Sequence, residues 1–487
     1  MRDYPALLNT DYYRISHIQQ YPEGIQEATA YLTPRTCRIK GYGMENGPVV
    51  FGIQGFIKKY LIDEMNKWFE LPKADALKQI SDELDGAFPI RALTEYSKLH
   101  DLGYLPLRIR GLLEGTICPI GCPMVEIENT HPDFAWLVNS IETMMSATVW
   151  HACMGATVGA AYKRIVNKYY AKTVCYTDTR EAMSDFSMRG QESIESAMKC
   201  SAGWGLSFNK TATVGVNHYL RESEYTSGNF MKGTISTEHS TMCSNYAVQG
   251  DEEAFYHRLL NDIYPDDNFA VVADAYDYWG FIDKILPRLK EDIMKHNGKM
   301  LVRGDSGDPV QITLDTIPKL WKLFGGYIND KGYKVLCPKI GFIYGDAITL
   351  NRCEQIYSGL EKMGFASDNV VLAAGSFSMQ AFQDEEGKIY PFTRDTYGFA
   401  TKVTHIVVNG KPYDVFKAPK TDPDSWKKSQ KGKCNVWYDN GKLKWVDGQD
   451  IQERNSAYRT YFKNGYTQPQ SLLGAILSLR DELEEEE

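Results

Sequence analysis

Hydrophobic residues in the first third of the chain follow two different spacings. Over residues 51–69 they recur every three or four positions with charged residues between them, which predicts an amphipathic helix. A second helical stretch is predicted over residues 134–150, continuing towards Tyr170. Residues 105–128 instead contain short apolar runs broken by glycine and proline, a pattern typical of short antiparallel strands.

Four apolar runs in the second half of the chain have a longer rhythm. They cover residues 269–274, 300–305, 340–346 and 369–375, and each ends in small or acidic residues before a helical spacing begins. Successive runs lie roughly 30 to 40 residues apart, the length of one strand, one helix and two loops. This rhythm predicts β/α units in a parallel sheet or barrel, with the residues that follow the strands gathered on one face. Further on, Asn409-Gly410 between two apolar runs predicts a hairpin turn.

Composition narrows the class of protein. The 487 residues carry 54 Lys and Arg against 63 Asp and Glu, a net charge of −9, whereas binding to nucleic acid requires a basic face. No stretch of about 18 uninterrupted apolar residues occurs and the N-terminus lacks a secretory pattern, so we expect no membrane segment. Ten scattered cysteines without metal-site spacing, and the lack of a His-x-x-x-His motif, predict reduced thiols, a cytoplasmic location and no protein-bound metal.

Acidic residues follow three of the four predicted strands. The segment 303–309, Arg-Gly-Asp-Ser-Gly-Asp-Pro, would by itself be only a turn rich in Asp and Gly. However, Asp274 with Asp277, Asp305 and Asp346 all fall at the same kind of strand end. Glycines allow a ligand to approach the backbone closely, and carboxylates accept hydrogen bonds from hydroxyl groups. These positions therefore predict a binding site for a polyol or a phosphate at the ends of the strands.

Other segments add candidates for anion binding and catalysis. Gly375 and Ser376 end the fourth strand, where backbone N–H groups at a helix start could cradle a phosphate. The Gly-Lys-Ser/Thr ending of a P-loop is missing and no Gly-x-Gly-x-x-Gly follows a strand, so a nucleotide-dependent kinase or a Rossmann dehydrogenase is unsupported. His239, between a glutamate and hydroxyl residues, is either an ordinary loop residue or a catalyst. A site for both a sugar phosphate and a pyrophosphate would need about as many cations as these: Arg35, Arg189, Arg394, Lys402 and Lys417.

In combination these segments resemble the nicotinamide phosphoribosyltransferases, which are type II phosphoribosyltransferases. The matching segments, in chain order, are Asn9–Pro22, Phe51–Gly55, Glu128–Thr130, Trp136–Thr143, Asp185–Gly190, Thr237–Thr241, Asp274–Asp277, Arg303–Gly307, Gly345–Asp346, Thr393–Asp395 and Asp414–Lys417. Single pieces such as Gly-Asp are common in proteins. The ordered combination covers nearly the whole chain and is specific.

The resemblance implies an α/β fold with two domains. An irregular β/α barrel over residues 146–399 would be the catalytic domain, and residues 1–145 with 400–487 would form an α+β flanking domain. It also implies a homodimer with two active sites at the interface. By similarity, Phe186 and, from the partner subunit, Tyr13 would stack on the two faces of a pyridine ring. Arg303 would hold the carboxamide oxygen, with Asp11 of the partner subunit nearby.

The resemblance also implies roles for the remaining candidates. Asp305 and Asp346 would bind ribose hydroxyls, and Gly375 with Ser376 would hold the 5′-phosphate. The five cations named above would serve the phosphate and pyrophosphate positions. His239 would be the histidine that is phosphorylated by ATP to drive the reaction. Asp277 is a further candidate for a catalytic residue. Magnesium would enter with the substrate 5-phosphoribosyl-1-diphosphate and keep several waters, without a closed protein cage.

One departure from the family pattern concerns the choice of base. Family members that select nicotinamide place an aspartate where this chain has Ala212, and that aspartate accepts a hydrogen bond from the amide and repels the carboxylate of nicotinic acid. With alanine, nicotinate remains an alternative substrate. Ser376 is a second departure, because the family loop is richer in glycine there. A different class of function, a metal-assisted phosphohydrolase using the strand-end aspartates and His239, is the third alternative.

Overall fold

The computed structural model describes residues 4–84, 90–418, 420, 429–448 and 456–485. The chain divides into two compact units. The flanking unit comprises residues 1–157, 217–228 and 392–487, and the central unit comprises residues 158–216 and 229–391.

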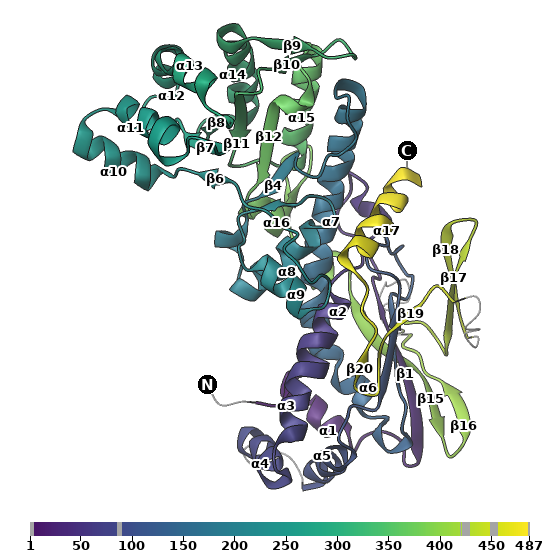
Figure 1. Cartoon of the computed structure of the whole chain (residues 1–487). Coiled ribbons are helices and arrows are strands. Elements are labelled where there is room, and N and C mark those ends of the chain that lie inside the picture. Colours follow the sequence, from purple (N-terminus) through teal and green to yellow (C-terminus); the bar gives the residue numbers. More distant parts are fainter. Residues whose placement is uncertain (1–3, 85–89, 419, 421–428, 449–455, 486–487) are drawn as a thin grey trace. The chain divides into compact units, whose positions relative to one another are not determined.

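The central unit is built on a sheet of seven parallel strands in the order β5-β4-β12-β11-β8-β7-β6 (Figure 1). Their bounds are β4 Met183–Asp185, β5 Lys210–Thr211, β6 Ile235–Ser236, β7 Phe269–Val272, β8 Met300–Gly304, β11 Ile340–Tyr344 and β12 Val370–Ala374. The four longer strands β7, β8, β11 and β12 begin within one residue of the four predicted apolar runs, which confirms the β/α rhythm. Strands β7 and β11 are buried throughout, as expected for a parallel sheet whose two faces are both covered.

The register of this sheet aligns the carboxyl ends of its strands. Phe342 of β11 lies opposite Val302 of β8 on one side and Val370 of β12 on the other. The residues that follow these strands therefore start at neighbouring positions along one edge. The edge strands β5 and β6 have two residues each, and one isolated parallel bridge joins Lys210 to Lys232, just before β6. The observed fold is thus a parallel half-barrel sheet, which confirms the α/β prediction in this coarser form.

Helices connect the parallel strands. Their bounds are α8 Ile194–Trp204, α10 His239–Gln249, α11 Glu252–Arg258, α12 Tyr278–Gly280, α13 Leu286–Lys295, α14 Pro309–Phe324, α15 Leu350–Lys362 and α16 Ser376–Gln380. Helix α14 shows how the local sequence fixes the loop after β8. The Asp308 side chain accepts a hydrogen bond from the Gln311 N–H at 2.9 Å, Pro309 occupies the first helical turn, and Gly325 ends the helix at a φ of +71°. The short hairpins β9 Gly326–Ile328 with β10 Lys334–Leu336, and β13 Ala381–Gln383 with β14 Ile389–Pro391, complete the unit.

The flanking unit contains a separate antiparallel sheet in the order β16-β15-β1-β3-β2-β19-β20 (Figure 1). Its strands are β1 Ile25–Thr33, β2 Leu107–Gly111, β3 Val125–Asn129, β15 Ala400–Val408, β16 Lys411–Asp414, β19 Arg459–Lys463 and β20 Tyr466–Thr467, and β17 Cys434–Asp439 pairs only with β18 Lys442–Asp447. The predicted strands within residues 105–128 are confirmed as β2 and β3. The predicted turn is also confirmed: Asn409 and Gly410 have φ values of +49° and +76° between β15 and β16, as a two-residue hairpin requires.

The helices of the flanking unit include both predicted helical stretches. They are α1 Arg14–His17, α2 Ile53–Phe56, α3 Glu64–Glu70, α4 Lys73–Leu84, α5 Ile90–Leu102, α6 Leu137–Ser140, α9 Val216–Glu222 and α17 Leu472–Glu485, and α7 Glu142–Thr173 extends from this unit into the central one. A π-helical turn at Ile57–Asp63 joins α2 to α3, so residues 53–70 form one continuous helical segment. The second predicted stretch is interrupted at Ile141, between α6 and α7.

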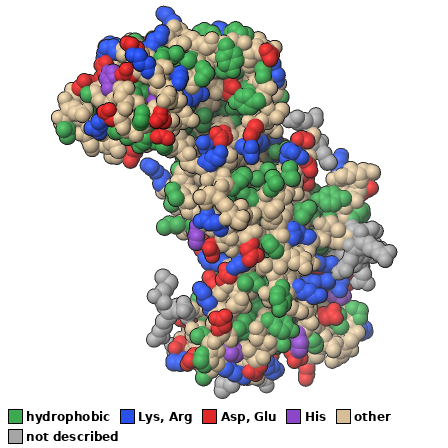
Figure 2. Space-filling model, viewed as in Figure 1, with side chains coloured by type: hydrophobic (Ala, Val, Ile, Leu, Met, Phe, Trp, Pro, Cys, Tyr) green, Lys and Arg blue, Asp and Glu red, His purple; other side chains and the backbone are tan. Residues whose placement is uncertain are grey.

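Two surface properties bear on the functional class. Across the residues that the structure describes, no helix is long and apolar enough to cross a membrane. On the face shown in Figure 2, acidic and basic side chains are interspersed over helices α10 to α13 of the central unit. That part of the surface is therefore not the continuous basic stripe that nucleic acid binding requires.

Candidate active site

A pocket of about 790 Å³ lies at the carboxyl edge of the parallel sheet in the central unit. Eight of the predicted site residues line it: Phe186, Arg189, Ala212, Arg303, Asp305, Asp346, Gly375 and Ser376. Arg303 lies near the end of β8, and the other seven follow β4, β5, β8, β11 or β12, whose carboxyl ends the parallel register brings together. The volume falls within the roughly 300 to 1,000 Å³ typical of small-molecule sites.

Arg303 is the central cation of this pocket. Its guanidinium carbon lies 5.6 Å from the centroid of the Phe186 ring, and one terminal nitrogen lies 3.2 Å from both carboxylate oxygens of Asp305. The other terminal nitrogen is 3.5 Å from Ser236 Oγ. The Nε atom of Arg303 is buried and has no hydrogen-bond partner within the described structure. Leaving such a buried donor unpaired costs about 1–3 kcal/mol.

Two glycines allow the loops to approach each other closely. At Gly345, a Cβ atom would lie 2.6 Å from Asp305 Oδ1 and 2.9 Å from Arg303 Nε. At Gly190, a Cβ atom would lie 2.2 Å from the Cβ and Oγ atoms of Ser376. Both distances are shorter than any ordinary contact, so a side chain at either position would displace groups that line the pocket. The sequence marked Gly345 only as part of a Gly-Asp pair, and its steric role emerges from the structure.

Carboxylates give this edge of the sheet a negative potential. Burial, followed by the nearby charges of Asp274, Asp305 and Asp346, raises the pKa of Tyr344. Asp346 itself is exposed, and Asp305 is partly buried. Such a set of acceptors suits sugar hydroxyl groups or a developing positive charge, and it is unsuited to a bare phosphate.

His239 is the first residue of α10, and it is linked to the pocket through Asp274. Its Nε2 atom lies 3.2 Å from Asp274 Oδ1, and Asp274 Oδ2 accepts the backbone N–H of Asp305, also at 3.2 Å. Only 3% of the Asp274 side chain is exposed, against 44% for His239. Asp274 was recognised as a strand-end residue but was not among the predicted site residues. The signal that could have found it is its position two residues after the buried strand β7, level with Asp305, since Val272 of β7 lies opposite Arg303 of β8.

Asp277 does not join the pocket. Its carboxylate accepts a hydrogen bond from the Gly280 N–H at 2.8 Å and caps the short helix α12. The spacing that grouped it with Asp274 in the sequence therefore corresponds in the structure to a helix cap, three residues further along the loop.

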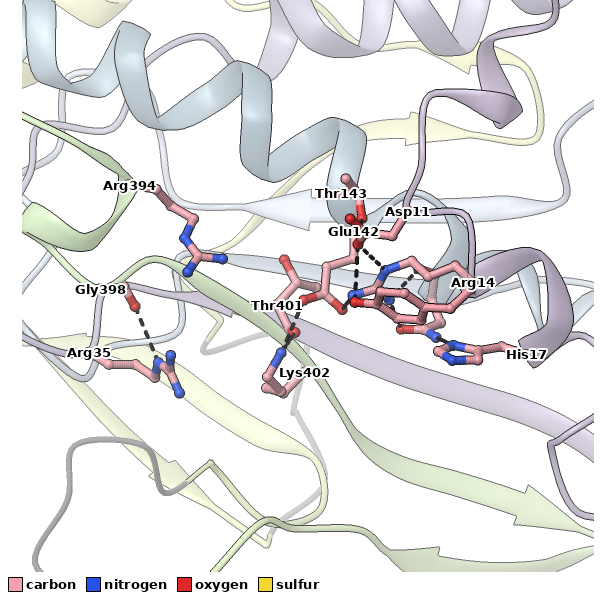
Figure 3. Close-up of polar contacts among 12 residues, drawn as sticks. Asp11, Arg14, His17, Arg35, Glu142, Thr143, Arg394, Gly398, Thr401 and Lys402 are labelled. Carbon is pink, nitrogen blue, oxygen red and sulfur yellow. Dashed lines mark hydrogen bonds and ion pairs between the residues drawn. The ribbon is translucent and has the colours of Figure 1, made fainter. Parts of the chain in front are cut away.

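In the flanking unit, Asp11 is the centre of a polar cluster at the start of α7 (Figure 3). It accepts hydrogen bonds from Thr143 Oγ1 at 2.7 Å, Arg14 Nε at 3.1 Å and Tyr13 OH at 3.2 Å. The hydrogen bond from Thr143, together with those from Arg14 and Tyr13 and the charge of Arg14, lowers the pKa of Asp11, so its carboxylate is ionised at neutral pH. Tyr13 is 59% exposed, which is high for an aromatic side chain.

Four of the five predicted phosphate-binding cations lie in the same unit, and three of them, Arg35, Arg394 and Lys402, are drawn in Figure 3. Lys402 Nζ lies 3.0 Å from Glu142 Oε1, and Arg35 Nε donates to the Gly398 carbonyl at 3.2 Å. Burial and the nearby positive charge of Arg394 lower the pKa of Arg35. Two guanidinium groups close enough to repel each other are typical of a site that binds an anion.

Two predictions remain, and they concern Lys417 and metal binding. Lys417 is exposed in the loop after β16, where its backbone N–H donates to Ser429 Oγ at 2.9 Å, and it takes no part in the contacts of Figure 3. Among the described residues, no group of three or more His, Cys, Asp or Glu side chains could hold a metal ion.

Comparison with known proteins adds to this geometry. Residues 182–465 match the model of the nicotinate phosphoribosyltransferase (NAPRTase) family, and residues 5–92 match that of the nicotinamide phosphoribosyltransferase N-terminal domain. The chain is 35% identical to the nicotinamide phosphoribosyltransferase of Acinetobacter baylyi, over 96% of this chain and 95% of that protein. It is 29% identical to the protein of the same name from Mycoplasma pneumoniae, over 86% and 93% of the two chains.

Solved structures show the same fold at lower identity. Nicotinate-nucleotide pyrophosphorylase from Pyrococcus furiosus superposes with a TM-score of 0.59 at 12% identity, covering 98% of this chain and 96% of that one. Human nicotinic acid phosphoribosyltransferase superposes with a TM-score of 0.56 at 14% identity, covering 97% and 93%. From these matches together, the chain belongs to the nicotinamide phosphoribosyltransferase family of type II phosphoribosyltransferases.

Proposed function

We propose that this protein transfers the phosphoribosyl group of 5-phosphoribosyl-1-diphosphate to nicotinamide, giving nicotinamide mononucleotide and pyrophosphate in NAD salvage. One observation carries the proposal: the guanidinium group of Arg303 lies beside the ring of Phe186, and both residues line the pocket. An aromatic amide matches both groups, since its ring stacks on Phe186 while its carbonyl oxygen accepts from Arg303. The names of the curated relatives support the same activity.

The other pocket residues fit the sugar and its phosphate. Asp305 and Asp346 supply acceptors for the ribose hydroxyls. Gly375 and Ser376, which begin the segment after β12, hold the 5′-phosphate through backbone N–H and hydroxyl groups. Arg189 lies in the same pocket. Arg35, Arg394, Lys402 and Lys417 neutralise the pyrophosphate and phosphate groups.

The reaction needs no protein nucleophile. The ring nitrogen of the base attacks C1 of the ribose, and the bond from C1 to the diphosphate oxygen breaks with its electron pair leaving on pyrophosphate. The ribose passes through an oxocarbenium-like state. The carboxylates at the sheet edge stabilise this positive charge, and the cations stabilise the leaving anion. Positioning and electrostatics therefore account for catalysis.

ATP and magnesium enter as partners of the substrates. Magnesium arrives with the diphosphate and keeps several of its waters. We infer that His239 accepts the terminal phosphoryl group of ATP: a bond forms from the ring nitrogen to phosphorus, and the bond from phosphorus to the bridging oxygen breaks with ADP as the leaving group. When its Nε2–H donates to Asp274, the lone pair on Nδ1 is available to the phosphorus atom, and Asp274 stabilises the charge that develops on the ring.

The assembly that we propose is a homodimer with an active site at each interface. The exposed ring of Tyr13 beside the ionised Asp11 suits a base bound mainly by the partner subunit. The catalytic domain is the irregular β/α barrel of residues 146–399, which the Lys210–Lys232 bridge helps to close, and residues 1–145 with 400–487 form the flanking domain. All ten cysteines are free, which supports a reducing, cytoplasmic location. The substrates are small molecules, with no role for nucleic acid or a membrane.

Nicotinate is the second candidate base, because Ala212 lines the pocket with a methyl group where an amide-selecting carboxylate would be expected.

The test is pyrophosphate release from 5-phosphoribosyl-1-diphosphate and magnesium with nicotinamide, nicotinate or no base, each with and without ATP. Release that depends on nicotinamide supports the proposal, and release that depends on nicotinate selects the second candidate. Release of phosphate without any base would instead indicate the phosphohydrolase.

A further inference from the structure

Asp185, the last residue of β4, is a buried carboxylate behind the wall of the pocket. It is completely inaccessible to solvent. Its Oδ2 atom accepts hydrogen bonds from the hydroxyls of Ser201 at 2.5 Å and Thr211 at 3.0 Å, and its Oδ1 atom accepts the backbone N–H of Ser187 at 2.9 Å. A buried carboxylate is tolerated only where such donors replace the water molecules that would hydrate it in solution. These donors come from three different segments, so one side chain holds the three in place.

The first segment that Asp185 holds is the loop that carries Ala212. The carbonyl oxygen of Asp185 accepts the Ala212 N–H at 2.8 Å, and the Thr213 N–H donates to Thr211 Oγ1 at 3.0 Å. The hydroxyls of Thr213 and Ser201 lie 2.8 Å apart. Because the protons of Ser201 and Thr211 are both used on the carboxylate, the Thr213 hydroxyl donates to Ser201. Every hydroxyl in the network thus points, directly or through a neighbour, towards Asp185.

The second segment is the one that carries Phe186. Its backbone N–H donates to the Ala374 carbonyl at 2.8 Å, which ties it to β12, and the next N–H, that of Ser187, donates to Asp185. Phe186 and Ala212 both line the pocket, whereas Asp185 does not. The same carboxylate therefore fixes two walls of the subsite that we assign to the pyridine ring.

We propose that Asp185 is a positioning residue for the pyridine base: it sets the separation between the ring of Phe186 and the methyl group of Ala212. This inference rests on the proposed function, because the substrate of the subsite is the base. The ribose and phosphate positions are built on β8, β11 and β12. Among the hydrogen bonds described, their residues donate none to the Asp185 carboxylate, and Ser376 Oγ makes only a long hydrogen bond, of 3.3 Å, to the Ser187 carbonyl. Weakening the network therefore affects binding of the base and spares binding of 5-phosphoribosyl-1-diphosphate.

The test compares two serines of α8. Ser201→Ala removes one donor to Asp185 and the anchor of Thr213. Ser196→Ala is the matched control, since Ser196 is equally buried on the same helix but donates to Glu192 Oε1 at 2.7 Å. In steady-state pyrophosphate release, Ser201→Ala is expected to raise KM for the base about five- to tenfold and to leave KM for 5-phosphoribosyl-1-diphosphate within about twofold. The control is expected to leave both values within about twofold.

A second variant, Asp185→Asn, keeps the size of the side chain but replaces one acceptor with an NH2 group. It is expected to raise KM for the base at least as much as Ser201→Ala, and thermal unfolding establishes that it is folded. If KM for both substrates rises in parallel in the folded variants, or if neither changes, Asp185 has only a structural role and the inference is wrong. If the unmodified protein releases no pyrophosphate with either pyridine, the proposed function itself fails and the inference fails with it.

Discussion

Replacing Gly345 with alanine tests whether the geometry around Arg303 determines activity. The new Cβ atom would lie 2.6 Å from Asp305 Oδ1 and 2.9 Å from Arg303 Nε, whereas ordinary contacts begin at 3.4 Å. The two side chains must therefore retreat by about 0.5–0.8 Å. The backbone at Gly345 does not have a positive φ, so alanine introduces a steric effect alone.

The two consequences of this substitution differ greatly in size. The groups that move are the ends of side chains, which adjust at a cost of about 1 kcal/mol, so Tm is expected to fall by no more than a few degrees. Catalysis is more sensitive, because a misplacement approaching 1 Å can cost about 100-fold in rate. We expect kcat/KM for the base to fall about 100-fold, equivalent to about 2.7 kcal/mol of transition-state stabilisation.

The assay is steady-state pyrophosphate release, with thermal unfolding measured on the same preparations. Gly228→Ala is the control, because Gly228 has no positive φ and no heavy atom lies within 4 Å of the position of its Cβ. The control is expected to retain its activity. A Gly345→Ala protein with unchanged kcat/KM would refute the reasoning, since the displaced Arg303 and Asp305 would then have no role in turnover.

Three further predictions address selectivity, turnover and stability. Ala212→Asp is expected to raise the ratio of kcat/KM for nicotinamide over nicotinate at least about tenfold by attracting the amide and repelling the carboxylate; equal losses with both bases would show that this position does not face the carboxamide. Asp305→Ala is expected to lower kcat about 100-fold with little change in Tm, because ribose acceptors are lost; unchanged kinetics would exclude the loop after β8 from the site. Burial raises the pKa of Glu114 from 4.5 to about 7. Between these pH values the native state keeps a proton that the unfolded chain releases. The contribution of this residue to the free energy of unfolding therefore falls by about 3 kcal/mol as pH rises from 4.5 to 7. Urea unfolding of Glu114→Gln at pH 5 and pH 8 should lack that part of the pH dependence, and identical pH profiles for variant and unmodified protein would contradict it.

The sequence was most informative for the four longer strands of the parallel sheet, which are mostly buried. Such strands read as continuous apolar runs, so β7, β8, β11 and β12 were predicted to within one residue at their starts. The loops that follow them were predicted to converge, and eight predicted residues do line one pocket. The remaining strands of the sheet, β4, β5 and β6, have two or three residues each, too short for a period of two to appear in the sequence.

The site was less predictable where a residue's role depends on a partner distant in the chain. Gly345 is one of 40 glycines, and only the proximity of Asp305 and Arg303 makes it necessary. Asp274 and Asp277 look alike in sequence, yet the first bonds to His239 while the second caps α12. Aspartate competes for nearby backbone N–H groups as readily as for catalytic partners, so sequence spacing alone does not separate the two roles.

The distribution of charge explains how an acidic chain can handle two phosphate-bearing substrates. The carboxylates Asp305 and Asp346 belong to the central unit, where the proposed reaction develops positive charge on the ribose. The cations Arg35, Arg394 and Lys402 belong to the flanking unit, and they are the groups that we propose for the leaving anion. Neither requirement depends on the net charge of −9, because each is met by a few side chains held at fixed positions. An acidic total therefore argues against duplex nucleic acid, which requires an extended basic surface, and remains compatible with small phosphorylated substrates.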